Sequence, residues 1–224
     1  MTSPATALVA GSTGLVGREC VDLLLGEPGF TRIIAVVRRT LHTTLESERL
    51  WIRRVDYEHL EQSADLFRVD MVFCALGTTM HDAGSESAFR RVDFDYAMAV
   101  ARLGLAGGAH HFLLVSALGA DPRSRIFYNR VKGELEHAVG ELGYRSLTII
   151  RPSLLVGERS GPRRFDRLTG RLAFLSPRRF RPVEATHVAS ALVGAAIQDE
   201  PGQRIIENRD IRQASHHPDH TRRS

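Results

Sequence analysis

Short apolar runs alternate with longer amphipathic segments through the first 150 residues of the chain. The apolar runs, rich in Val, Ile and Leu, predict strands over residues 5–10, 31–37, 50–55, 70–76, 110–116 and 144–151. Apolar positions at helical spacing predict helices over residues 15–25, 85–106 and 124–142. Strands that alternate with helices through short turns predict an α/β fold with a doubly wound parallel sheet.

A glycine motif joins the first predicted strand to the first helix. Gly11, Gly14 and Gly17 have the spacing G-x-x-G-x-x-G, and Ser12 stands where the commoner fingerprint has its second glycine. Such glycines allow a tight turn, close approach of backbone N–H groups to a pyrophosphate, and packing of the helix on the strand. We therefore predict a Rossmann-type sheet whose first turn binds a dinucleotide. The predicted contacts are Gly11, Ser12, Thr13, Gly14, Leu15, Val16 and Gly17.

The second strand ends in Arg38 and Arg39, where an NAD-preferring protein usually carries an acid for the ribose hydroxyl. An arginine pair at this point suits a 2′-phosphate, so we favour NADP(H), with NAD(H) as the alternative. The other interpretation of the pair is a solvated loop in an arginine-rich chain. Asp56, after the third strand, either contacts the adenine edge or caps the following helix, and capping is the favoured role.

Two further turns follow predicted strands at the same edge of the sheet. Leu76, Gly77, Thr78 and Thr79 end the fourth strand, and Pro152, Ser153 and Leu154 leave the sixth. Ligands bind at the carboxyl ends of strands in open α/β sheets, so we include both turns in the predicted cofactor site. The alternative for the Gly-Thr-Thr turn is a connection without ligand contact.

Lys132 is the only lysine among 30 basic residues, and Tyr128 precedes it by one helical turn. A phenol needs a nearby cation to exchange protons near neutral pH, since its unperturbed pKa is about 10. Ser116 ends the fifth strand on the ligand-binding edge, although a serine there is commonly a cap. Together the three predict carbonyl chemistry: Ser116 orients the carbonyl, Tyr128 transfers the proton, and Lys132 lowers the phenol pKa and holds the nicotinamide ribose.

Arginine and proline crowd residues 159–181, where the composition changes. This segment can form a lid over the site, bind an acidic partner, or remain a solvated basic face. A helix over 184–198 and a strand over 203–207 follow. We divide the chain into a dinucleotide-binding core (1–157), a small substrate or lid region packed on it (158–210) and a polar tail (211–224).

Composition narrows the class of protein. The hydrophobic fraction is 43% and the net charge is only +4. This balance favours small anionic ligands, and nucleic-acid binding is not expected. No apolar run reaches the ~20 residues of a membrane span. Cys20 and Cys74 lie in apolar segments and, with no leader pattern at the N-terminus, predict a cytoplasmic protein with buried thiols. Monomer and homodimer both remain open.

The ordered motifs resemble the short-chain dehydrogenase/reductase superfamily in its extended and atypical forms, and more narrowly the small Tat-interacting-protein-like NAD(P)H-binding proteins. The resemblance covers about residues 5–207. Its carriers are residues 11–17, Arg38-Arg39, 76–79, 91–93, 116–121, 128–134 and 151–159. Ala117 departs from the pattern, because relatives often have a second serine there.

This resemblance implies a Rossmann fold, an NADP-type cofactor and a Ser-Tyr-Lys site. We therefore expect an NADP(H)-dependent oxidoreductase that acts on a small carbonyl or alcohol. The alternative is a regulatory protein that senses the redox state of NAD(P)H with little or no turnover.

Overall fold

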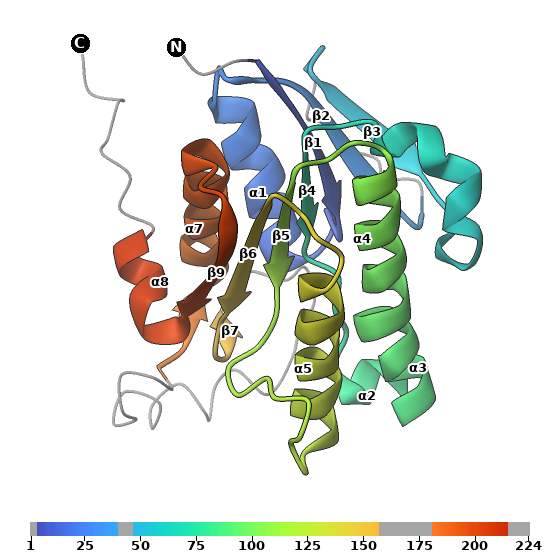
Figure 1. Ribbon diagram of the computed structural model, residues 1–224, viewed down its shortest axis with the longest axis vertical. Coiled ribbons are helices and arrows are strands. Elements are labelled where there is room, and N and C mark those ends of the chain that lie inside the picture. Colours follow the sequence, from blue (N-terminus) through green and yellow to red (C-terminus); the bar gives the residue numbers. More distant parts are fainter. Residues whose placement is uncertain (1–3, 40–46, 157–180, 215–224) are drawn as a thin grey trace.

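A seven-stranded parallel sheet forms the centre of the molecule, with strand order β3-β2-β1-β4-β5-β6-β9 (Figure 1). The computed structural model describes residues 4–39, 47–156 and 181–214. The strands are β1 (Ala5–Ala10), β2 (Phe30–Val37), β3 (Leu50–Arg54), β4 (Met71–Cys74), β5 (His111–Val115), β6 (Ser146–Arg151) and β9 (Gly202–Glu207). The predicted doubly wound α/β fold is confirmed, and the seven predicted strands lie within two residues of their expected bounds.

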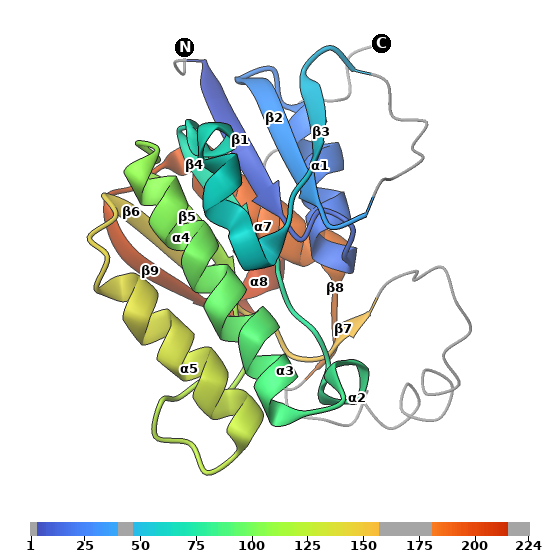
Figure 2. The same cartoon turned by 90° about the vertical axis from the view of Figure 1, so that its right-hand side faces the viewer.

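Helices cover both faces of the sheet (Figures 1 and 2). One face packs against α1 (Leu15–Gly26), α7 (Ala185–Gln198) and α8 (Asn208–Ala214). The other packs against a 3-10 segment (Tyr57–Phe67), α4 (Ala97–Ala106) and α5 (Phe127–Gly140). Alternate residues of a strand therefore enter different cores: Ala7 and Val9 face α1, whereas Leu8 and Ala10 face α4. No helix in the described ranges is long and apolar enough to cross a membrane.

The C-terminal region contributes directly to this architecture. The predicted strand at 203–207 is β9, which pairs with β6 at the edge of the main sheet. α7 lies in the same apolar core as α1. Two short strands, β7 (Leu155–Val156) and β8 (Val183–Glu184), pair with each other in a separate two-stranded sheet. Residues 158–180 of the predicted lid and 215–224 of the predicted tail lie outside the described residues.

The predicted helix over 85–106 has three parts. The first part is α3 (Glu86–Arg90) and the last is α4; the short helix α2 (Met80–Ala83) precedes them. Between α3 and α4, residues 91–96 form a π-helical turn. Such turns widen the helix locally and occur frequently at functional sites. This turn carries the buried Asp93.

The strand order reverses between β1 and β4. From β1 the chain builds outward through β2 and β3, then crosses back to place β4 on the other side of β1. A reversal of this kind leaves a crevice at the carboxyl ends of the two central strands, because their connections run in opposite directions. The turns after Ala10 and Cys74 therefore lie together at this edge.

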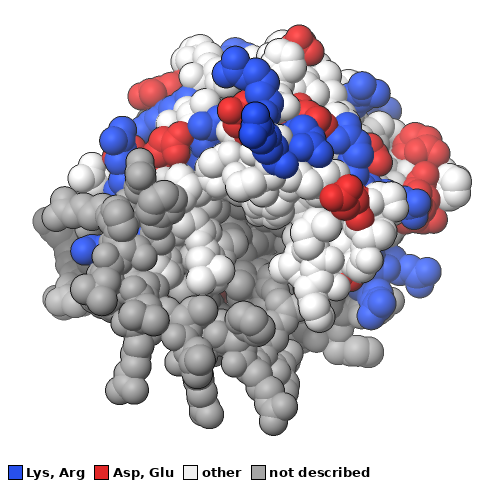
Figure 3. Space-filling view, turned by 90° about the horizontal axis from the view of Figure 1, so that it is seen from below, with Lys and Arg blue, Asp and Glu red and all other residues white. Residues whose placement is uncertain are grey.

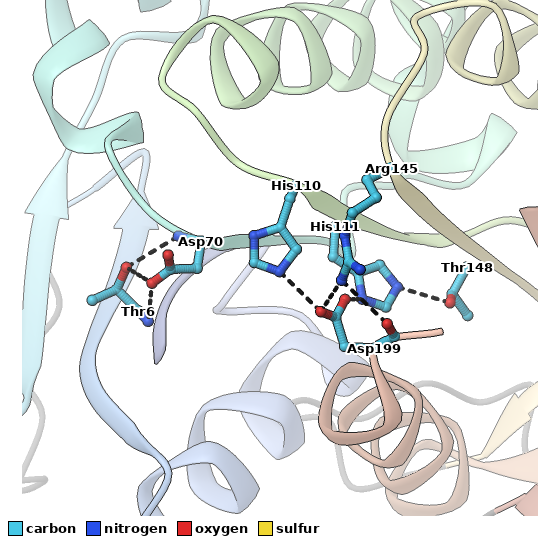
Figure 4. Close-up of polar contacts among 7 residues, drawn as sticks. All are labelled: Thr6, Asp70, His110, His111, Arg145, Thr148 and Asp199. Atoms are coloured by element: carbon cyan, nitrogen blue, oxygen red, sulfur yellow. Dashed lines mark hydrogen bonds and ion pairs between the residues drawn. The ribbon is translucent and has the colours of Figure 1, made fainter. Parts of the chain in front are cut away.

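A polar cluster fixes the opposite, amino end of the sheet (Figure 4). Asp199, which ends α7 in a left-handed conformation with φ of 45°, directs its carboxylate at the start of β5. His110 Nε2 lies 3.1 Å and His111 Nδ1 3.0 Å from that carboxylate, and Arg145 also pairs with it. His111 Nε2 lies 3.0 Å from the Thr148 hydroxyl on β6. The cluster fixes α7 to the sheet.

A second polar contact joins β1 to β4 at the same end (Figure 4). The backbone N–H and the hydroxyl of Thr6 both donate to the Asp70 carboxylate at 2.7 Å. The Asp70 N–H returns a bond to the Thr6 hydroxyl at 3.1 Å. These bonds set the register of the two central strands, on which the site at their other end depends.

Protonation of His111 should destabilise the fold. Burial lowers its pKa to about 4, even though Asp199 favours the charged form. The unfolded chain, with a histidine pKa near 6.5, binds this proton first as the pH falls, so stability declines from about pH 6.5 towards 4. The linkage amounts to about 2 kcal/mol between pH 7.5 and 5.

Replacement of this imidazole tests the effect. Between pH 7.5 and 5, the free energy of unfolding of His111→Gln should fall by about 2 kcal/mol less than that of the wild type. Urea denaturation at the two pH values measures this difference. His110→Gln removes an imidazole from the same carboxylate at a half-buried position and serves as the control. Equal pH dependence in wild type and His111→Gln would contradict the assignment.

Candidate active site

The glycine turn after β1 is held tightly against the turn after β4. Gly11 has a φ of 82°, and a Cβ there would lie 2.5 Å from the Ala75 carbonyl oxygen. A Cβ on Gly17 would lie 2.1 Å from the Gly11 carbonyl oxygen, so α1 can pack this closely only with glycine. The Ser12 hydroxyl donates to the Val36 carbonyl at 3.0 Å, and this bond ties the turn to β2. Serine in place of the second glycine thus has a structural reason.

The start of α1 suits an anionic group. The helix begins at Leu15, directly after Gly14, and its first turn has no acidic side chain. Unpaired N–H groups at a helix N-terminus attract phosphate. Thr13 is exposed beside them, whereas Val16 packs into the core under α1. The loop therefore fits a dinucleotide pyrophosphate by its backbone rather than by charged side chains.

A cavity of about 570 Å³ lies at the ends of β2 and β3, and one of its lining residues, Tyr57, contacts Gly11 of this turn. Arg38 and Arg54 bring positive charge to it, and Tyr57 and Tyr96 line it with aromatic rings whose centroids are 5.3 Å apart. Arg39 is exposed and does not line this cavity. Aromatic rings can stack on a flat base, and guanidinium groups can bind a phosphate.

Asp56 also borders this cavity, and it caps the segment that follows β3. Its carboxylate accepts the Glu58 N–H at 3.0 Å, so the favoured capping role is observed. Arg54 was not predicted. It ends the strand next to β2, and that position brings it to the same cavity as Arg38.

A buried ion pair joins α5 to the π-helical turn at Arg91–Tyr96. Lys132 Nζ is 2.6 Å from Asp93 Oδ1, and the exposed fractions of these residues are 3% and 0%. The Thr78 N–H donates to the other Asp93 oxygen at 2.9 Å. Gly77 lies against the pair, since a Cβ there would be 3.5 Å from Asp93 Oδ1 and 3.8 Å from Lys132 Nζ. The single lysine is therefore fixed at the carboxyl edge of the sheet.

Tyr128 lies one turn before Lys132 on α5, with its ring 5.4 Å from that of Phe89. Burial raises the pKa of its phenol, Lys132 lowers it, and Asp93 raises it, so the net pKa lies above the ordinary value. For Lys132, burial lowers the pKa, but Asp93 and Tyr128 raise it more. Without bound cofactor the site therefore pairs a neutral phenol with a charged ammonium.

Ser116 makes a different contact from the one expected. Its hydroxyl donates to Glu136, which lies two turns after Tyr128 on α5. Arg151 on β6 binds the same carboxylate, with 2.6 Å between Nη2 and Oε2, and also pairs with Glu207 on β9 at 3.0 Å. The structure thus brings Tyr128 and Lys132 together and places the Ser116 hydroxyl in a network that joins α5 to the sheet edge.

The remaining predicted residues border the same edge. Thr79 caps α2 by accepting the Asp82 N–H at 3.0 Å, and Leu76 packs against the core under α4. Pro152 accepts the Leu118 N–H through its carbonyl at 2.8 Å.

The turn after β6 is fixed by α8. The Ser153 N–H donates to the Asn208 side chain at 2.8 Å. Leu154 is 61% exposed. Figure 3 looks onto this edge, where the coloured charged groups lie mostly on the upper and right-hand parts of the view.

Asp93 and Glu136, like Arg54, are site residues that the sequence pattern did not identify. Asp93 interrupts an otherwise apolar helical stripe. That interruption was the available signal, since a buried carboxylate needs a partner and Lys132 is the only ammonium side chain in the chain. Glu136 had no comparable signal, because it follows Lys132 by one turn on a helix with many polar residues.

Comparison with known proteins places this chain in a family. The pattern of the NAD(P)H-binding family matches residues 11–196, from the glycine turn to α7. This chain belongs to the NAD(P)H-binding family. Protein HTATIP2 of Rattus norvegicus is 38% identical over 162 residues, which cover 70% of this chain and 66% of the rat protein. Protein FMP52-1 of Scheffersomyces stipitis is 32% identical over 226 residues and covers 92% of this chain and 96% of its own.

Solved structures support the same assignment at the level of the fold. MoeE5 in complex with UDP-glucose and NAD superposes with a TM-score of 0.71 over 90% of this chain and 75% of its own, at 19% identity. A short-chain dehydrogenase from Burkholderia cenocepacia in complex with NADP has a TM-score of 0.68 over 95% and 93%, at 17% identity. The expected resemblance to an atypical short-chain dehydrogenase/reductase subgroup is confirmed.

The relatives leave two expectations open. NAD is bound in one of these structures and NADP in the other, so the comparisons do not distinguish the two cofactors. The Scheffersomyces stipitis protein is named as mitochondrial, so cytoplasmic localisation stays a prediction.

Proposed function

We propose that this protein is an NADP(H)-dependent oxidoreductase that interconverts a small carbonyl compound and its alcohol. The observation that carries the proposal is the pair formed by the half-buried Tyr128 and the buried Lys132, which lie one turn apart on α5, with Lys132 beside the Gly77 turn. Cofactor sensing alone does not need a phenol held next to an ammonium. Proton transfer to a carbonyl oxygen does.

The residues have distinct roles in this proposal. The Gly11–Gly17 loop and the start of α1 hold the pyrophosphate, and Lys132 holds the nicotinamide ribose with the donors that Asp93 leaves free. The reduced nicotinamide supplies the hydride when bound. Tyr128 gives its proton to the carbonyl oxygen as the C–H bond forms, and its oxygen regains a proton from water.

Ser116 has a smaller part in the proposal than Tyr128. Its hydroxyl donates a hydrogen bond to Glu136, so Ser116 can bind a substrate carbonyl only if that hydrogen bond breaks. We keep Ser116 as a predicted orienting group and assign the proton transfer to Tyr128.

The cofactor preference follows from the cavity beside the glycine turn. Arg38 and Arg54 bring two guanidinium groups to it, and a 2′-phosphate on the adenine ribose would meet both. The ring pair of Tyr57 and Tyr96 lies on the adenine side in this arrangement. These contacts support NADP(H) over NAD(H).

Tyr128→Phe tests the reaction. The ring keeps its packing on Phe89, but the proton donor is lost, so carbonyl reduction by NADPH should fall about 100-fold or more while NADPH binding is unchanged. The measurement is steady-state reduction of a panel of small aldehydes and ketones, with cofactor affinity from fluorescence titration.

Tyr144→Phe is the matched control, because it removes a phenol that donates to the Ala101 carbonyl away from the site. Wild-type turnover in Tyr128→Phe would refute the mechanism. Tight NADPH binding without turnover on any carbonyl would favour the redox-sensing alternative.

Arg38→Ala tests the cofactor preference. It should weaken NADPH binding about tenfold or more and leave NADH binding unchanged, since a hydrogen bond to a charged group contributes about 1.5–3 kcal/mol. Arg39→Ala removes the same charge from the adjacent exposed position and should change neither affinity. Equal wild-type affinity for NADPH and NADH would exclude the 2′-phosphate assignment.

A further inference from the structure

Asp93 reaches the site through the π-helical turn at Arg91–Tyr96. Both of its oxygens are engaged: Oδ1 lies 2.6 Å from Lys132 Nζ, and Oδ2 accepts the Thr78 N–H at 2.9 Å. The carboxylate therefore connects the turn after β4 to α5. Since it is fully buried, its charge acts on its neighbours with little screening by solvent.

The charge of Asp93 changes what Lys132 does to Tyr128. An unpaired ammonium near a phenol stabilises the phenolate. Here a carboxylate in direct contact with the ammonium offsets most of that effect, and burial disfavours the phenolate further. Within the described residues, the other titratable group facing the pair is the Cys74 thiol, whose pKa burial raises to about 11, so it adds no charge at neutral pH. Phe89 faces the phenol from α3 with an uncharged ring.

We propose that Asp93 is a positioning residue that keeps Tyr128 protonated at neutral pH, the form that donates a proton to a carbonyl oxygen. The proposal rests on the proposed function and adds the protonation state in which the phenol acts. In reduction, the carbonyl π bond breaks, carbon gains the hydride from the reduced nicotinamide, and oxygen gains the Tyr128 proton. Oxidation needs the phenolate as a base and is therefore expected only at alkaline pH.

Asp93→Asn removes the charge but keeps the size of the side chain and an oxygen for Thr78. Tyr128 should then ionise at least about one pH unit lower, because a lone ammonium shifts a neighbouring acid by about 1–3 units. Tyrosinate absorbance is titrated in each protein, and the same titration in its Tyr128→Phe form is subtracted. The alkaline limb of the reductase pH profile should move down by the same amount.

Asp95→Asn is the matched control, because it removes the same charge from an exposed position on the same turn. It should titrate like the wild type. Equal titration of Asp93→Asn and wild type would overturn the proposal. If Asp93→Asn does not fold, the wild type decides: Tyr128 should ionise above about 10, the value of a free phenol, and ionisation near pH 8 would overturn it.

These titrations need no substrate, so they separate the two proposals. Absence of turnover would remove the proposed function while the ionisation of Tyr128 could still be measured. Turnover with an unshifted Asp93→Asn profile would leave the oxidoreductase standing and remove the role of Asp93.

Discussion

The buried contact between Asp93 and Lys132 is the interaction on which the site depends. Removing either partner of a buried ion pair typically costs about 3–5 kcal/mol, because the other charge is left uncompensated. Here the pair joins three segments far apart in the sequence: the turn after β4 through Thr78, the π-helical turn through Asp93, and α5 through Lys132. The position of Tyr128 relative to the sheet follows from the same contact, since it lies one turn before Lys132.

The topology of the sheet decides where this pair lies. Reversal of the strand order at β1 and β4 brings the Gly11 turn against Ala75, and Gly77 then lies against Asp93 and Lys132. The glycine loop, the arginine-lined cavity and the phenol thus occupy one edge of one sheet. At the other end, the contacts of Thr6 with Asp70 and of Asp199 with His111 set the strand register and fix α7. The candidate site therefore lies at the carboxyl ends of the strands, and the contacts that fix strand register and α7 lie at their amino ends.

Much of this arrangement could be predicted because it rests on local patterns. Apolar runs defined the strands, and the glycine spacing defined the turn at Gly11, since both depend on backbone requirements that few residue types satisfy. Tyr128 and Lys132 were paired from helical periodicity alone. The predicted fold class is confirmed, and so is the predicted membership of an NAD(P)H-binding family.

What could not be predicted depends on contacts across the fold. Neither the pairing of Asp93 with Lys132 nor the bond from Ser116 to Glu136 follows from sequence spacing. The π-helical turn shifts the helical register by an amount that periodicity does not reveal. Arg54 reaches the cavity only because β3 lies next to β2 in the sheet.

The most direct test uses the fact that Lys132 is the only lysine in the chain. Protein made with isotope-labelled lysine gives a single side-chain Nζ resonance, and that resonance reports the site alone. Our account predicts a charged, solvent-protected ammonium at neutral pH whose resonance shifts when NADPH saturates the protein. A freely exchanging, solvent-exposed ammonium that does not respond to NADPH would contradict it.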